Sequence, residues 1–145
     1  MMTFVLDCST TMAWCFEDEK CGYGDYILDL LNDASAIAPT IWALEVANVL
    51  LVAQRKRRIN AAESERFLSR LSALPIRIDE AASVRVWTDI FQLALRLSLS
   101  SYDAAYLEIA IRCRVPLATL HDRLRRSAIE AGIEALSYPP ARQRR

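Results

Sequence analysis

Four carboxylates stand where the predicted strands and helices begin or end, and their side chains could do chemistry together. Asp7 ends the apolar run "TFVL", and Asp122 closely follows the run "PLATL". Asp103 falls in the first turn of a predicted helix at 101–113, and Glu45 in the second turn of another at 41–57. Hard divalent ions such as Mg²⁺ and Mn²⁺ take oxygen ligands of this kind. Because such an ion can activate a water and stabilise the leaving oxygen of a phosphodiester, we predict metal-dependent phosphoryl hydrolysis.

Glu45 is the carboxylate that is hardest to explain without a ligand. It lies within "IWALEVANVLL", a stretch that is apolar apart from Glu45 and Asn48. Thr40 is the expected cap of this helix, so Glu45 lies beyond the free amides of the first turn. Burying its charge unpaired would cost several kcal/mol. A metal ion would explain this polar spot, whereas a polar contact within the helix is the structural alternative for Asn48.

The other acids have structural alternatives of their own. Asp103 stands three residues after Ser100, as in a capping box, and the helix dipole favours an acid in a first turn. Asp7 by itself could be an ordinary strand-end residue. Asn60, followed by "AAE", repeats the cap pattern, and Gly132 falls where a left-handed helix end is expected. The acids converge only if the fold brings them together.

Short apolar strands alternate with longer helices along the chain. This order predicts an α/β fold with a short parallel central sheet covered by helices on both faces, in three layers. In such a sheet the loops that follow the strands share one edge, where ligands bind. We expect strands at 3–6, 35–38, 75–78, 116–120 and 133–136, and helices at 10–18, 25–34, 41–57, 61–73, 80–98, 101–113 and 123–131.

Length and charge limit the classes of protein to consider. A chain of 145 residues favours a single domain, here 1–138, and we expect the basic end 139–145 to be a disordered tail. With 18 acidic and 18 basic residues, no overall field attracts the chain to nucleic acid or to a membrane. We find neither a signal peptide nor an apolar run of membrane-spanning length, and therefore expect a cytoplasmic protein without a membrane partner.

Cysteine and tryptophan are expected to serve packing. The four Cys lack C-x-x-C spacing and are predicted to be reduced thiols of the core. All three Trp, at 14, 42 and 87, are predicted core residues. Trp14 is the one best placed to stack on a base, because it lies close behind Asp7.

Four segments resemble the PIN-domain ribonucleases, and most closely the VapC-type toxins of bacterial toxin–antitoxin pairs. They read "FVLDCSTTMAWCFEDE", "WALEVANVLL", "LSSYDAAYLEIAIR" and "PLATLHDRL", and the similarity spans residues 3 to about 136. The resemblance implies a PIN-like three-layer α/β/α fold, a homodimer, and cleavage of RNA that depends on Mg²⁺ or Mn²⁺. It also implies a small cognate antitoxin whose tail occupies the acidic groove. The family's acidic residues carry over to Asp7, Glu45 and Asp103, with Ser9 and Asn48 as supporting residues.

The fourth acidic ligand departs from the family pattern. Where the family reads T-x-D-x-x-L, this chain reads "TLHDRL", which puts His121 at the aspartate and Asp122 one residue later. We predict that a loop adjustment turns Asp122 inward, because a hard-ion site favours a charged ligand over a neutral one. His121 would then be a supporting residue. His121 as the ligand is the alternative, and a softer nitrogen ligand favours Mn²⁺.

Two basic stretches could hold RNA phosphates or be solvated. "QRKRR" at 54–58 ends a helix, where cations complement the dipole, so a solvated helix end is expected there. "RLRRS" at 123–127 directly follows the predicted edge, and we expect Arg123, Arg125 and Arg126 to bind RNA.

Other functions fit the sequence less well. A phosphatase of the haloacid-dehalogenase type needs a second Asp two residues after the first, and this chain has Ser9 there. A nucleotide-binding module needs a glycine-rich turn, and "DCSTTMAW" contains no glycine. The strongest non-enzyme alternative is a PIN-like scaffold, impaired by the change at His121, that binds its partner or RNA without cleaving.

Overall fold

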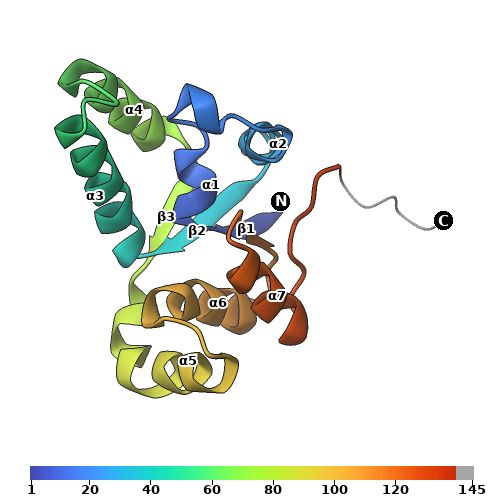
Figure 1. The fold of residues 1–145 in the computed structure, drawn as a ribbon. Helices are drawn as coiled ribbons and strands as arrows, with labels where there is room; N and C mark the ends of the chain where they lie inside the picture. Colours follow the sequence, from blue (N-terminus) through green and yellow to red (C-terminus); the bar gives the residue numbers. More distant parts are fainter. Residues whose placement is uncertain (140–145) are drawn as a thin grey trace.

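A four-stranded parallel sheet lies at the centre of the computed structural model, which describes residues 1–139 (Figure 1). The strands lie in the order β3-β2-β1-β4, so the switch point of the sheet is between β1 and β4. Val5 pairs with Ile37 on one side and with Leu117 on the other. The bounds are β1 (Thr3–Leu6), β2 (Ser35–Pro39), β3 (Ile76–Asp79) and β4 (Leu117–Ala118).

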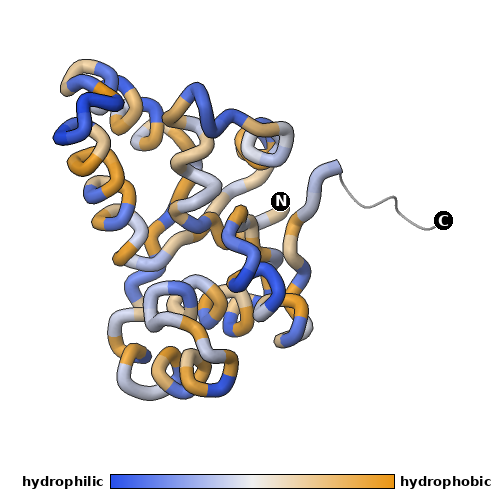
Figure 2. The backbone as a smooth tube through the Cα atoms, in the orientation of Figure 1, coloured by the Kyte–Doolittle hydropathy of each residue, from blue (hydrophilic) through white to orange (hydrophobic). Residues whose placement is uncertain are grey.

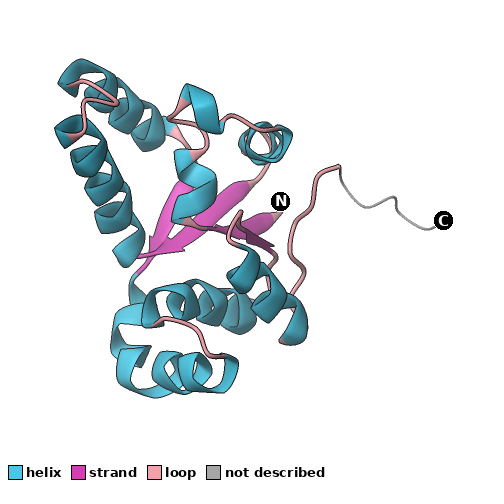
Figure 3. Ribbon diagram, in the orientation of Figure 1, coloured by secondary structure: helices cyan, strands magenta, loops and turns pink. Residues whose placement is uncertain are grey.

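Helices cover both faces of the sheet, which confirms the predicted three layers (Figures 1 and 3). Helices α1 to α4 lie on one side and α5 to α7 on the other, and α6 contacts β1, β2 and β4. The bounds are α1 (Cys8–Met12), α2 (Gly22–Leu30), α3 (Ile41–Arg55), α4 (Ala61–Ala73), α5 (Phe91–Leu97), α6 (Ser101–Cys113) and α7 (Asp122–Glu130), with the 3-10 helices η1 (Glu17–Glu19) and η2 (Glu80–Arg85) and the π-helix η3 (Val86–Ile90).

The apolar runs of the central strands form the core. Phe4, Val5 and Leu6 are all fully buried, because helices cover both faces of β1. Ile37 of β2 and Leu117 of β4 are buried beside them. The strands therefore leave polar positions only at their ends, and the polar side chains that follow them meet at the carboxyl edge.

Cap chemistry sets most of the helix starts. Asn60 and Glu63 form the complete capping box predicted for α4. In α6 only half of the box forms: Ser100 Oγ accepts from the Asp103 amide at 3.1 Å, and the Asp103 carboxylate faces another residue. Thr40 occupies the cap position of α3, but its side chain makes no cap hydrogen bond, because its backbone is already helical at φ −55° and ψ −32°.

Segment 80–98 differs most from its prediction as one helix. It starts as η2, continues as η3 and only then becomes α5. A π-helical turn holds more residues than an α-helical one and so rotates the faces of the helix. Trp87, in η3, is 91 % exposed, and the prediction that it belongs to the core is wrong. Trp42 is buried as predicted, and the half-buried Trp14 donates its indole N–H to Gly24 O at 2.8 Å.

Smaller corrections concern the ends of elements. The segment predicted as a strand at 133–136 forms only an isolated bridge, from Ala135 to Leu117. Its neighbour β4 has only two residues, so there is no room for a longer run of strand pairing. The helix predicted at 10–18 begins earlier, at Cys8, because Asp7 caps it, and it already ends at Met12, with η1 following at Glu17. Gly132 adopts φ 78°, as expected at a helix end.

The thiols and the chain end complete the comparison with the predictions. All four Cys are free as expected. Cys8, Cys15 and Cys21 are half-buried and pack against the core, whereas Cys113 is exposed, so the core prediction is wrong for Cys113. Of the predicted tail 139–145, residues 140–145 lie outside the described residues. Within the described part of the chain, no helix is both long and apolar enough to cross a membrane.

Candidate active site

The crevice at the switch point of the sheet brings together the residues that follow β1 and β4. Asp7 follows β1 and Thr119 follows β4, and both are buried. The Asp7 amide donates to Ala118 O at 3.2 Å, which continues the pairing of the two strands past the end of β1. In an open parallel sheet this is the place where ligands bind, so Asp7 has the position of a ligand-binding residue.

Asp7 is surrounded by hydroxyl and amide donors. Ser9 Oγ lies 2.9 and 2.8 Å from the two carboxylate oxygens. The Thr10 amide donates to Oδ1 at 3.0 Å, and Thr119 Oγ1 donates to Oδ2. Burial raises the pKa of Asp7, and these hydrogen bonds offset only part of that effect. No lysine or arginine among residues 1–139 pairs with Asp7.

Glu45 has a partner that the sequence did not reveal. It is half-buried on α3, and Tyr106 Oη of α6 donates to its Oε1 at 2.6 Å. Burial raises the pKa of Glu45, the Tyr106 hydrogen bond acts against this, and the charges of Asp7 and Asp103 add to the increase. Glu45 is therefore within electrostatic reach of both Asp7 and Asp103, and it links the acids that the sequence placed at strand and helix ends.

Asp103 turns toward the loop after β4. Its Oδ2 lies 3.0 Å from Nδ1 of His121, the cap residue of α7. The His121 amide donates to Thr119 Oγ1 at 3.0 Å, which fixes the loop in this position. Asp122 is exposed, and no hydrogen bond or ion pair of its carboxylate occurs within the described residues. The structure thus places His121, and not Asp122, beside Asp103, while the identity of a fourth metal ligand stays a prediction.

The two supporting residues differ in their surroundings. Ser9 Oγ bonds to Asp7 and also accepts from the Leu120 amide at 3.0 Å, which ties α1 to the loop after β4. Asn48 is exposed on α3, and its side chain makes no hydrogen bond within residues 1–139. The polar contact within the helix that was the alternative for Asn48 is therefore not formed.

Thr119, Tyr106 and Tyr23 contribute to the site and were not predicted to do so. Thr119 could have been found, because it is the threonine of the T-x-D pattern. Tyr106 and Tyr23 carry no local signal, since the residues they bind lie 61 and 96 positions away in the sequence.

The donor atoms suit a hard divalent ion, although the side chains do not stand in a finished metal site. Within residues 1–139, no group of three or more His, Cys, Asp or Glu is arranged to hold a metal ion. Glu45 and Asp103 are instead turned to Tyr106 and His121. The raised pKa values of Asp7 and Glu45 show that a nearby positive charge would be favourable. Carboxylate oxygens are also the ligands that Mg²⁺ and Mn²⁺ take, so the residues fit such an ion chemically.

Cys8 is the other reactive group at this edge. Burial raises the pKa of its thiol to about 12, and the charges of Glu45 and Asp7 add to the shift. The thiolate is the nucleophilic form of cysteine. Cys8 is therefore a neutral thiol near neutral pH, and a covalent mechanism through it is disfavoured.

The two basic stretches lie at the end of α3 and the start of α7, both blue in Figure 2. Arg58 pairs with two acids of η1, so this helix end is bound to its neighbour as well as solvated. Arg123 and Arg126 are exposed. Arg125 is half-buried, and its Nη2 donates to Thr119 O at 2.9 Å. RNA contact by the three arginines of α7 stays a prediction.

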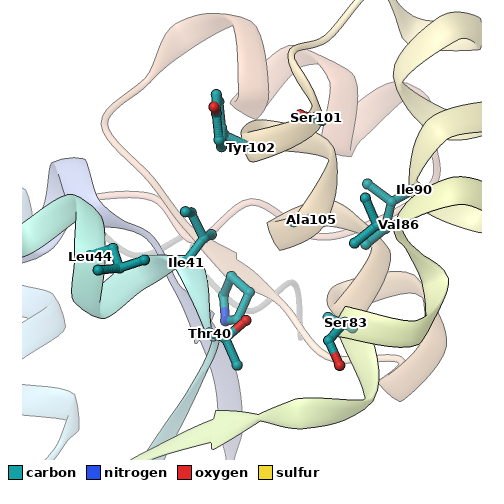
Figure 4. A pocket seen from close by; sticks show the side chains of 11 residues that line it. Thr40, Ile41, Leu44, Ser83, Val86, Ile90, Ser101, Tyr102 and Ala105 are labelled. Atoms are coloured by element: carbon teal, nitrogen blue, oxygen red, sulfur yellow. The ribbon is translucent and has the colours of Figure 1, made fainter.

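An apolar pocket of about 300 Å³ adjoins the acidic edge, the name we give to the side chains of Asp7, Glu45 and Asp103 (Figure 4). It lies between the start of α3, the η2–η3 segment and the start of α6. Leu44 and Tyr102, next to Glu45 and Asp103 in sequence, line it and are 68 % and 58 % exposed. Val86 of η3 faces them across the pocket. Apolar side chains exposed in this way are typical of a binding surface.

Comparison with known proteins identifies the fold through structure rather than sequence. No family model and no curated protein matches the chain. PAE2754 from Pyrobaculum aerophilum is similar with a TM-score of 0.65 and 18 % identity, over 87 % of this chain and 84 % of that one. VapBC2 from Rickettsia felis, in a structure bound to a DNA fragment from its promoter, has a TM-score of 0.61 and 14 % identity, over 86 % of this chain and 92 % of that one. A toxin–antitoxin complex from Klebsiella pneumoniae has a TM-score of 0.57 and 15 % identity, over 84 % of this chain and 89 % of that one. These likenesses confirm the expected PIN-like fold.

Proposed function

We propose that this PIN-like chain is a VapC-type toxin that cleaves RNA as an endoribonuclease dependent on Mg²⁺ or Mn²⁺. One observation carries the proposal: Asp7, Glu45 and Asp103 converge from β1, α3 and α6, and none pairs with a lysine or arginine of residues 1–139. Acids that serve only stability are paired when they are buried. The similarity to a toxin–antitoxin complex supports the toxin role.

The residues of the edge have distinct tasks in this proposal. Asp7, Glu45 and Asp103 would hold the metal ion, and the ion would supply activation of a water and stabilisation of charge on the phosphodiester. Ser9 and Thr119 orient the two oxygens of Asp7 through their hydroxyls. The exposed guanidiniums at the start of α7 are the proposed contacts to RNA phosphates.

Cleavage assays with purified protein test the proposal. We expect RNA cleavage with Mg²⁺ or Mn²⁺ and none in EDTA. Asp7→Asn and Asp103→Asn should reduce cleavage by more than about 100-fold, since even changes to groups behind a metal ligand cost 10–100-fold. Asp29→Asn is the matched control, because Asp29 is exposed on the last turn of α2, which leads to the start of β2. Cleavage at the wild-type rate by either site variant would contradict the assignment.

We also propose a small cognate antitoxin as partner, with its tail over the acidic edge, and a homodimer of the toxin. Leu44 and Tyr102 beside the edge and Trp87 of η3 are exposed apolar side chains, and they support a protein partner. Expression of the chain alone should arrest bacterial growth, and co-expression with a short protein encoded beside it should restore growth. Harmless overexpression of folded, metal-binding protein would count against the toxin role. Light scattering of wild type and Trp87→Ser tests the homodimer.

The alternative is a PIN-like scaffold that binds without cleaving. His121 stands where the family pattern has an aspartate and lies beside Asp103, which favours this alternative. Calorimetric titration with Mg²⁺ and Mn²⁺ beside the cleavage assay separates the two: a nuclease binds at least one ion and cleaves RNA, whereas a scaffold does not cleave RNA whether or not it binds an ion.

A further inference from the structure

The loop after β4 is held by two side chains that have no task in the proposed reaction. Thr119 is fully buried and lies one residue past the end of β4, beyond the ladder of the sheet. Tyr23 Oη accepts from the Thr119 amide at 3.0 Å, and Arg125 Nη2 donates to Thr119 O at 2.9 Å. A buried backbone group without a partner is costly. The two side chains therefore replace the missing strand partner on both backbone groups of Thr119.

Tyr23 and Arg125 also contact each other. The guanidinium carbon of Arg125 lies 5.2 Å from the centroid of the Tyr23 ring, within the range of a cation–π interaction. Tyr23 belongs to α2 and is buried, and Arg125 belongs to α7 and is half-buried. Burial raises the pKa of the Tyr23 hydroxyl to about 12, so it keeps its proton at neutral pH. We call this pair the Tyr23–Arg125 clamp.

Thr119 passes the restraint of the clamp to the acidic edge. Its Oγ1 donates to Asp7 and accepts from the His121 amide at 3.0 Å. His121 in turn lies 3.0 Å from Asp103. A displacement of Thr119 would consequently reorient Asp7 and move His121 relative to Asp103 at the same time.

We propose that Tyr23 and Arg125 are positioning residues, which orient the acidic edge through Thr119, and that Arg125 serves in this way rather than by binding RNA. The expected effect on catalysis rests on the proposed function, whereas the hold on the loop does not. Groups one step behind a metal ligand typically change metal affinity or activity by about 10–100-fold. The clamp is one step behind Asp7 in the same sense, because both of its side chains bind Thr119 and Thr119 binds Asp7.

Amide hydrogen exchange tests the hold on the loop without any nuclease assay. Tyr23→Phe removes one buried oxygen, and Arg125→Met removes the donor while keeping an apolar stem over the ring. Tyr26→Phe on α2 and Arg126→Met on α7 are matched controls. We expect exchange at residues 119–121 to accelerate by about tenfold or more in both clamp variants, because opening of the loop becomes easier, and to stay at the wild-type rate in both controls. Wild-type exchange in Tyr23→Phe and Arg125→Met would overturn the clamp.

Kinetics then test the positioning role. Both clamp variants should lower kcat by about tenfold and weaken Mn²⁺ binding, with the KM for RNA unchanged. The double variant should lose less than the product of the two single losses, because both act on the same residue. Arg125→Met could instead raise the KM for RNA and make the RNA-binding constant less dependent on salt concentration, by the amount expected for the loss of about one phosphate contact. That result would show that Arg125 binds RNA and that its positioning role is wrong. If the wild type does not cleave RNA, the proposed function fails, and exchange still decides the clamp.

Discussion

Asp7 and Asp79 are both buried aspartates at the carboxyl ends of parallel strands, yet their surroundings differ. Asp79 ends the outer strand β3 and binds Nη2 of Arg112, which also places its Nε 2.8 Å from Glu108 Oε1. Those hydrogen bonds raise the pKa of Arg112. Asp7 follows the central strand β1 directly and has only hydroxyl and amide donors around it.

The difference shows how residues of one type serve two purposes in one sheet. Arg112 pairs with Asp79 and Glu108, and Arg85 Nε lies 3.7 Å from Glu108 Oε1, so the charge at Asp79 is balanced within the protein. This cluster holds α6 against the end of β3 and needs no ligand. Charge at Asp7 is left unbalanced, and burial raises the pKa of that carboxyl. A stability cost of this kind is common at functional sites, where the missing charge belongs to a ligand. The comparison leads to four tests.

Removing the cation of the paired cluster should have the largest effect. Arg112→Met leaves Asp79 and Glu108 buried at 7 % and 5 % exposure without a common cation. Breaking a buried ion pair in this way costs about 3–5 kcal/mol. Urea unfolding should show this loss, with Arg70→Met, an exposed arginine on α4, as the control. A loss below about 1 kcal/mol would make the cluster a surface feature.

The pH dependence of stability should reveal the unbalanced charge at Asp7. Because burial raises its folded-state pKa above the unfolded value near 3.9, the folded protein binds the proton more tightly. The free energy of unfolding therefore falls as pH rises from about 3.9 through the raised pKa and levels off above it. In EDTA, the difference between Asp7→Asn and wild type should grow in favour of the variant over this range. Urea unfolding between about pH 4 and 8 measures it, and a constant difference contradicts the assignment.

A divalent ion should stabilise the acidic edge and leave the paired cluster unaffected. At ten times its Kd, Mg²⁺ or Mn²⁺ should raise the free energy of unfolding of the wild type by about 1.4 kcal/mol. Thermal melts should show no such gain for Asp7→Asn and a full gain for Arg112→Met. Equal gains in all three proteins would mean that the ion binds elsewhere.

The smallest expected effect is that of Glu45→Gln in EDTA. The amide keeps an acceptor for the Tyr106 hydroxyl and removes a half-buried charge whose pKa is raised by burial. Stability at neutral pH should rise by less than about 1 kcal/mol, because solvent screens a partly exposed carboxylate. Glu45→Leu is the comparison, since it leaves the buried hydroxyl unpaired and should be less stable than Glu45→Gln by about 1 kcal/mol. Equal melting temperatures for the two variants would contradict this explanation.

Elements that depend on local pattern could be predicted from the sequence. The run of Phe4, Val5 and Leu6 indicated a strand buried on both faces, and the structure confirms this burial. Asn60 and Glu63 predicted the start of α4, because a capping box needs only residues three apart. The prediction of one regular helix at 80–98 is wrong, since a π-helical turn changes the helical period there and Trp87 is exposed.

The sequence by itself determined which residues stand at strand and helix ends, and so made Asp7, Glu45 and Asp103 candidates for one shared edge. Periodicity and caps act over a few residues, so this much is encoded locally. Only the tertiary structure decided what each acid faces: Tyr106 for Glu45 and His121 for Asp103. These partners come from other helices and loops, and their choice depends on how whole elements pack. For the same reason, whether a buried aspartate meets an arginine or a row of hydroxyls cannot be read from its neighbours in the chain.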